Sequence, residues 1–160
     1  MATYDETLGG GSGFFHQLRS SVWQAIDIVV ADIIAAHATL TTNAKITAAD
    51  VIQIYDIPAG SFLTGKAVLE TIVAGTAGQT FDISSAEDDY LFNGVAGDSA
   101  VGTMTVNLVG DDWGADSVQG VTFAATDTLD CKFVADEIIG HWVLWLEIVN
   151  LSKVGQVDGY

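Results

Sequence analysis

From residue 50 onward, short runs in which apolar and polar side chains alternate follow one another, with glycine and aspartate between them. This period of two is typical of β-strands that bury one face of a sheet. In "SFLTGKAVLETIV" the alternation places Leu63, Ala67, Leu69, Thr71 and Val73 on one face. Runs this closely spaced leave no room for the crossover helices of a parallel sheet. The pattern predicts an all-β protein, an antiparallel β-sandwich of jelly-roll-like type with about eight strands.

Two later runs refine this prediction. "VGTMTVNLV" places Met104, Val106 and Leu108 on one side, and threonine and asparagine on the other. The last run, "HWVLWLEIVNL", is apolar on nearly both sides, which is expected of a central strand that is covered on each face. Trp142 and Trp145 are three residues apart in this run, so they are predicted to face opposite sides of the sheet.

The segment from residue 22 to residue 40 allows two interpretations. Val22, Ile26, Val29, Ile33 and later apolar residues keep the spacing of an amphipathic helix. The stretch "VWQAIDIVV", however, is rich in β-branched and aromatic residues, as a half-buried strand would be. Periodicity alone leaves both open.

The N-terminal residues 1–19 are predicted to form a flexible arm, because "GGGSG" loses much backbone entropy on ordering. Phe14, Phe15 and Leu18 follow the glycines, and they either dock on another surface or begin the core. The predicted organisation is an arm over residues 1–19, a β-sandwich over residues 20–152 and a tail over residues 153–160.

Charge excludes several classes of partner. The chain has 21 acidic and 5 basic residues in 160, giving a formal net charge of -16. Such a surface repels phosphate backbones and anionic membranes, so neither nucleic acid nor a membrane is expected to bind it. The longest apolar region is interrupted by charged residues, and the polar, acidic start lacks the pattern of a secretory signal.

Side chains that could perform chemistry are few. Cys131 is the only cysteine, and alternation places it with Leu129 and Phe133 on a buried side of a strand. The histidines His16, His37 and His141 do not have metal-ligand spacing. No serine lies in a nucleophile elbow, and no phosphate-binding loop is present. We therefore expect no catalytic residue, no metal site and no cofactor.

Two acidic stretches contain the oxygen ligands that calcium prefers, "SSAEDDYLFNG" and "VGDDWGADS". Neither has EF-hand spacing, and solvated turns explain their carboxylates equally well. Trp113 lies in the second stretch, where it is available to pack locally, to stack on a sugar or to enter a pocket on a partner.

A family resemblance adds to these observations. The stretch "DVIQIYDIPAGSFLTGKAVLETIVAGTAGQTFDI", followed by "DDYLFNG", "FAATDTLDCKF" and "HWVLWLEIVNLS", resembles small structural proteins of tailed bacteriophages. The resemblance covers roughly residues 20 to 151, and its motifs are turns and strand edges rather than catalytic signatures.

The resemblance implies a β-sandwich decoration or cement protein on the exterior of a phage capsid. Its expected partner is the major capsid protein, and we expect a homo-oligomer, with a trimer favoured because it suits capsid three-fold positions. It also implies that "VWQAIDIVV" is a strand. Side chains assigned to capsid or subunit contacts are Phe14, Phe15, Leu18, Trp23 and Trp113. Further apolar side chains expected at subunit contacts are Val22, Ile33, Ile34, Trp142 and Trp145.

An alternative function is a host-recognition module of a phage fibre or tail. Such a module would bind glycans through loop aromatics such as Trp113 and Tyr90, with calcium held in the acidic loops. Sugar binding that disappears with a chelator would distinguish it from a decoration protein.

Overall fold

The computed structural model describes residues 21–85, 90–107 and 120–150. The predicted arm and tail lie outside these residues. The elements follow one another in the order β1 (Val22–Val29), α2 (Val30–Ala36), α3 (Ala38–Asn43), β2 (Ile52–Ile57), β3 (Ser61–Val73), β4 (Thr80–Ser84), β5 (Tyr90–Ala96), β6 (Met104–Asn107), β7 (Val121–Phe123), β8 (Asp127–Phe133) and β9 (His141–Asn150).

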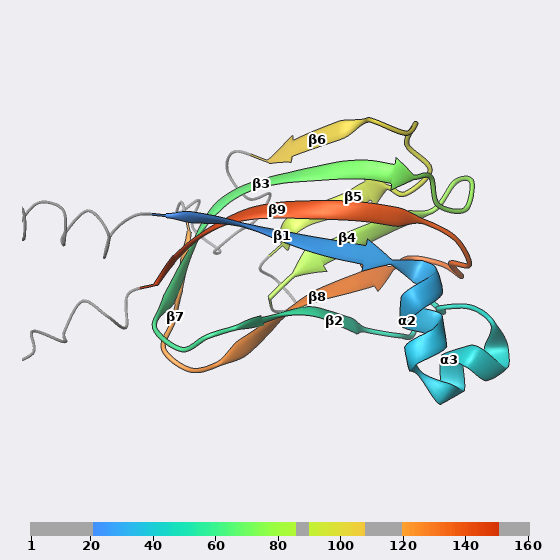
Figure 1. The fold of residues 1–160 in the computed structure, drawn as a ribbon, viewed down its shortest axis with the longest axis horizontal. Coiled ribbons are helices and arrows are strands. Elements are labelled where there is room, and N and C mark those ends of the chain that lie inside the picture. The colour runs from blue at the N-terminus through green and yellow to red at the C-terminus, as the bar shows by residue number, and fades with distance from the viewer. Residues whose placement is uncertain (1–20, 86–89, 108–119, 151–160) are drawn as a thin grey trace, which may run out of the picture.

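The strands form two antiparallel sheets that pack face to face (Figure 1). The first, which we call sheet I, has the order β1-β9-β3-β6, and β7 pairs with the start of β3 on the same side as β6. The second, sheet II, has the order β2-β8-β4-β5. Helices α2 and α3 lie beside one end of the sandwich, and β7 lies at the opposite end (Figure 1). The prediction of an all-β antiparallel sandwich is confirmed.

The core lies between the sheets and is filled by alternate side chains of each strand. On β8, Leu129, Cys131 and Phe133 are completely buried, as the alternation in the sequence predicted. Phe81 of β4 packs against Trp142 of β9, with ring centroids 4.9 Å apart. Aromatic pairs at this separation contribute on the order of 1 kcal/mol beyond their burial. The largest side chains of the two sheets therefore hold the sandwich together toward the end at which β1 passes into α2.

The segment from residue 22 to residue 40 contains both predicted structures. Its first half is β1, and the chain becomes helical at Val30. From there Ile33 and Ile34 follow at helical spacing and pack against the core, while alanine supplies high helix propensity. The Thr41 hydroxyl donates to the carbonyl oxygens of Ile34 and His37, which fastens α3 to α2. The resemblance implied a strand over "VWQAIDIVV", and β1 covers this stretch up to Val29.

Some assignments of individual side chains are wrong. Val73 was expected beside Leu69 and Thr71, but its side chain is exposed because the register of β3 against β9 shifts between Thr71 and Val73. Trp142 was expected at a subunit contact and is completely buried. It faces the core because residues 142, 144 and 146 of β9 point inward.

Candidate assembly surface

The described residues hold their reactive groups apart from one another. Burial raises the pKa of the Cys131 thiol, so it is not a nucleophile at neutral pH. The His141 Nε2 atom lies 2.9 Å from Asp27 Oδ1 in an exposed pair, and His37 is exposed between the two helices. Within the described ranges, no group of three or more His, Cys, Asp or Glu side chains could hold a metal ion.

One depression is lined by the turns at the end of β2 and before β8, including Asp56, Pro58 and Asp127. It is open to solvent and has no histidine, cysteine or lysine in its lining. Among the described helices, none is long and apolar enough to cross a membrane.

The outer face of sheet II is polar along its two central strands. On β8, Thr128, Asp130 and Lys132 alternate with buried residues and face outward, and Lys132 lies opposite Asp82 of β4. The Asp82 carboxylate also accepts a hydrogen bond of 2.7 Å from the backbone N–H of Gly94. This face has the polar character that is usual where an antiparallel sheet meets water.

The outer face of sheet I is different, because an apolar row crosses all four strands. Ala25 of β1 lies opposite Trp145 of β9, Trp145 lies opposite Val68 of β3, and Val68 lies opposite Val106 of β6. The neighbours of Val68 and Trp145 along the chain are buried, so these two side chains point outward. Trp145 is 40% exposed and Val106 is 55% exposed.

Further apolar side chains extend this row. Val143 and Met104 lie in the next row, two residues along their strands, and Trp23 lies on β1 opposite Glu147. Met104 is 62% exposed and Trp23 is 48% exposed. We call this set the apolar face; it consists of Trp23, Ala25, Val68, Met104, Val106, Val143 and Trp145.

The size of the apolar face sets it apart from scattered surface residues. Four strands spaced about 4.8 Å apart, and three rows of outward side chains, cover roughly 20 by 20 Å, or about 400 Å², an area that also contains the side chains of Asp27, Glu70 and Glu147. An apolar patch within an area of this size lies in the range of the largest patch on a typical monomer, and such patches are often functional.

Acidic side chains lie on the same side of sheet I, Asp27 at the edge of the apolar face and Glu70 between Val143 and Met104. Asp27 and Glu70 belong to the row that contains Val143 and Met104, and Glu147 lies beside Trp23. A hydrogen bond from the Ser21 hydroxyl is the main cause that lowers the pKa of Glu147, with further contributions from Thr64 and Lys66. Glu147 is therefore charged at neutral pH.

The residues assigned to contacts from the sequence have different outcomes. The structure places Trp23 and Trp145 on the apolar face, whereas Phe14, Phe15, Leu18 and Trp113 lie outside the described residues. The carboxylates considered for calcium, Glu87, Asp88, Asp89, Asp111, Asp112 and Asp116, lie outside them too.

Sequence reasoning missed Val68, Val143, Met104 and Val106 as surface residues. The signal was present in β9, whose run is apolar on both sides. We interpreted that run as a strand covered on each face, but here its second face is open. On β6 the apolar side is the exposed one, and Thr105, which lies opposite the buried Leu69, faces inward.

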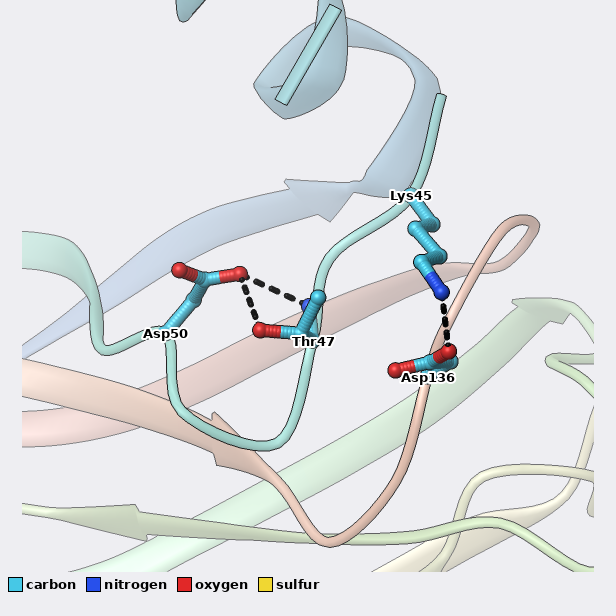
Figure 2. Close-up of polar contacts among 4 residues, drawn as sticks. All are labelled: Lys45, Thr47, Asp50 and Asp136. Atoms are coloured by element: carbon cyan, nitrogen blue, oxygen red, sulfur yellow. Dashed lines mark hydrogen bonds and ion pairs between the residues drawn. The ribbon is translucent and has the colours of Figure 1, made fainter. Parts of the chain in front are cut away.

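A network of polar contacts fixes the loops at the helical end of the sandwich. The ammonium of Lys45 lies 2.5 Å from a carboxylate oxygen of Asp136, which joins the segment before β2 to the segment after β8 (Figure 2). Asp50 accepts hydrogen bonds from the backbone N–H and the hydroxyl of Thr47, at 2.7 and 2.8 Å, and they lower its pKa. The scaffold that carries the apolar face is thus braced at this end.

No protein-family model matches the chain, and no curated protein matches it. Its structure is similar to a chain of the solved structure "Capsid of Ralstonia phage GP4", with 14% sequence identity and a TM-score of 0.49, over 82% of this chain and 84% of that chain. It is also similar to a chain of "Acidic stable capsid structure of Helicobacter pylori bacteriophage KHP30", with 16% identity and a TM-score of 0.35, over 79% of this chain and 92% of that chain. Both are structures of phage capsids.

Proposed function

We propose that the protein is a non-enzymatic structural component of a phage virion, a decoration or cement protein that binds the major capsid protein on the capsid exterior and stabilises the shell. The observation that carries this proposal is the apolar face, which covers the outside of one sheet on a chain of charge -16. An exposed apolar face lowers the solubility of a chain and adds nothing to its own core, so neither explains why the face is present. A protein that works by lying against a larger assembly does need one.

Charge supports the exterior location. A net charge of -16 opposes contact with packaged nucleic acid and with anionic membranes, so neither is a partner in this proposal. On the outside of a shell, the chain is separated from the packaged nucleic acid. In this position its polar sheet II faces solvent and its apolar face lies against the shell.

The strand order supports a jelly roll as the architecture. The short β7 is left out of this comparison, and the eight remaining strands of the described residues are numbered 1 to 8 along the chain. Sheet I then has the order 1-8-3-6, and sheet II has the order 2-7-4-5. Consecutive strands then alternate between the sheets except at β4 and β5, an arrangement that corresponds to two interleaved Greek keys.

A homo-oligomer, with a trimer favoured, belongs to the same proposal. Exposed apolar side chains outside the apolar face are available for contacts between copies, among them Val101, Ile138 and Ile139. The expected arm, residues 1–19, would add a tether that ends in Phe14, Phe15 and Leu18.

Cross-linking of intact particles tests the function. A reagent that couples carboxylates to amines suits a chain this acidic, and mass spectrometry should identify links between this protein and the major shell protein. Links to a fibre or tail protein alone, together with glycan binding that a chelator abolishes, would contradict the decoration role and favour the host-recognition module.

A further inference from the structure

The apolar face raises the question of what covers it. Within the described ranges no strand or helix lies across the outside of sheet I, since α2 and α3 are beside its end (Figure 1). Three kinds of occupant remain: a second copy of this chain, a lipid surface, or a different protein.

The charges around the face argue against a second copy. Asp27, Glu70 and Glu147 lie on the same side of sheet I, and the nearest basic groups are Lys66 and His141, each of which already lies beside one of these carboxylates. Two copies placed face to face would therefore bring carboxylates together, on chains that each have a net charge of -16. Like charges at short range oppose such a contact.

The area of the apolar face limits a contact with any protein partner, a second copy included. Two faces of about 400 Å² each would together bury about 800 Å², less than the roughly 1,200 Å² at which stable protein–protein interfaces begin. A contact of this size becomes specific when charge complementarity adds to apolar burial. The carboxylates of Asp27 and Glu70 provide the negative half of such a complementary pair of surfaces.

A lipid surface does not fit the same carboxylates. Biological membranes with anionic headgroups repel carboxylates, and the face lacks the lysine and arginine residues that a peripheral membrane protein presents there. The carboxylates are suited instead to lysine and arginine side chains on a partner protein.

We infer that the apolar face binds a different protein, one with an apolar patch bordered by lysine or arginine side chains that meet Asp27 and Glu70, whereas Glu147 already accepts hydrogen bonds within this chain. This inference rests on the proposed function, in which the partner is the shell protein. It specifies the surface used, the chemistry of the partner's surface and the sign of the salt dependence. Binding weakens as salt rises, because ions screen the attraction between the carboxylates of Asp27 and Glu70 and the basic groups.

The test uses the full chain and capsid shells purified without it, with the bound fraction measured over a concentration series at about 0.05 M and about 0.5 M salt, where the screening lengths differ several-fold. Trp145→Gln should weaken binding at least about tenfold, as expected for a central aromatic contact. Val106→Thr removes apolar character at nearly constant shape and should weaken binding less. Val134→Thr is its matched control, because Val134 is 58% exposed but lies after β8, outside the apolar face.

The charged side chains have their own matched pair. Glu70→Gln should weaken binding at low salt and reduce the salt dependence of binding. Asp56→Asn, at an exposed position of β2 in sheet II, should change neither. Unfolding curves of each variant establish that the fold is retained. The sedimentation profile of the free protein should be the same for wild type and Trp145→Gln.

Each other outcome overturns the inference in a recognisable way. Equal binding of wild type and Trp145→Gln shows that another surface contacts the shell. A change of oligomeric state in Trp145→Gln, or self-association of the wild type that rises with salt, shows that a second copy covers the face. If wild-type protein does not bind shells at all, the proposed function fails, and the inference fails with it.

Discussion

Trp142 is completely buried beside glycines that leave space for its indole ring. A Cβ atom added to Gly140 would lie 2.1 Å from the ring of Trp142, and one added to Gly75 would lie 2.9 Å from it. Gly140 also has a φ of 137°, a backbone conformation that residues other than glycine rarely adopt. The position of the largest core side chain thus depends on residues that have no side chain at all.

Gly140→Ala is expected to destabilise the protein by about 3 kcal/mol, from backbone strain and the collision with Trp142 together. Gly102→Ala is the matched control, because Gly102 has a φ of 82° but no atom within 4 Å of an added Cβ. Its expected effect is about 1 kcal/mol, from backbone strain alone. Denaturant unfolding followed by tryptophan fluorescence measures both, and equal effects would contradict this account of Trp142.

Glu137 is a completely buried carboxylate that connects two loops at the helical end. Its Oε1 atom accepts hydrogen bonds from the backbone N–H and the hydroxyl of Thr76, and from the backbone N–H groups of Ile138 and Ile139. The backbone of Glu137 also pairs with Ile46 in an isolated β-bridge. This side chain organises the segment that enters β9.

Glu137→Ala is expected to lower the free energy of unfolding by about 3 kcal/mol, because several donors lose their acceptor in a buried place. The adjacent Asp136→Ala removes only the exposed pair with Lys45 and is expected to change stability by less than about 1 kcal/mol. Thermal or denaturant unfolding of the two variants checks the difference. A loss at Asp136 as large as that at Glu137 would show that burial is not the reason.

At the scale of elements, Glu147 of β9 connects three strands or their ends. Its carboxylate accepts a hydrogen bond of 2.7 Å from the Thr64 hydroxyl of β3, interacts with Lys66, and accepts another from Ser21 just before β1. These partners stabilise the charged form and lower the pKa of the side chain from its ordinary value of 4.5.

Because the pKa of Glu147 is lower in the folded chain than in the unfolded chain, its contribution to stability is complete above pH 4.5 and is lost as the pH falls through the lower, folded value. Glu147→Gln is therefore expected to be less stable than wild type near pH 7, by about 1 kcal/mol. The difference should shrink as the pH falls below about 4. Unfolding curves of both proteins across this range test the sign, and a difference that grows toward acid would contradict it.

Much of this element structure could be predicted from the sequence, because burial of one face gives each strand its own alternation. The burial of Leu129, Cys131 and Phe133, and the opposite orientations of Trp142 and Trp145, both follow from a period of two. The exposure of Val73 could not be predicted, since it depends on a register shift against β9 that is set between strands. The change from strand to helix at Val30 could not be predicted either, because residues 22–40 fit both the spacing of a helix and the composition of a strand.

The apolar face was hidden for a related physical reason. Alternation shows which side chains share a side of a strand, and it does not show which side faces the other sheet. On β6 the apolar side holds Met104 and Val106, and the natural interpretation puts such a side inward. The pairing of Val106 with Val68, whose neighbours Ala67 and Leu69 are buried, shows the opposite.

At the scale of the whole molecule, the chain enters β1 and leaves β9 at the same end of the sandwich, because Val22 lies opposite Ile148. This end is opposite the helices α2 and α3 (Figure 1). Residues 1–20 are therefore attached near Trp23, beside one edge of the apolar face. The arm that we expect over residues 1–19 would join β1 there, where it would add contacts to the same proposed partner.

Deletion of residues 1–19 is expected to leave the β-sandwich folded and to weaken attachment to the capsid. Each phenylalanine of the pair Phe14 and Phe15 would contribute on the order of 2 kcal/mol if removed from water, less the entropy lost on ordering the tether. Unfolding curves and capsid occupancy of the truncated and full chains are the measurements. Unchanged occupancy would show that the arm is not an anchor, and unfolding of the domain would show that these residues belong to its core.

In the proposed function, the apolar face of sheet I is the surface by which this protein lies on a phage shell. Imaging of intact particles at a resolution that separates strands tests it most directly. The claim predicts a β-sandwich on the capsid exterior with β1, β9, β3 and β6 against the shell protein, Trp145 inside the contact and sheet II toward solvent. A sandwich with sheet II against the shell and Trp145 exposed, or a particle without this protein, would contradict it.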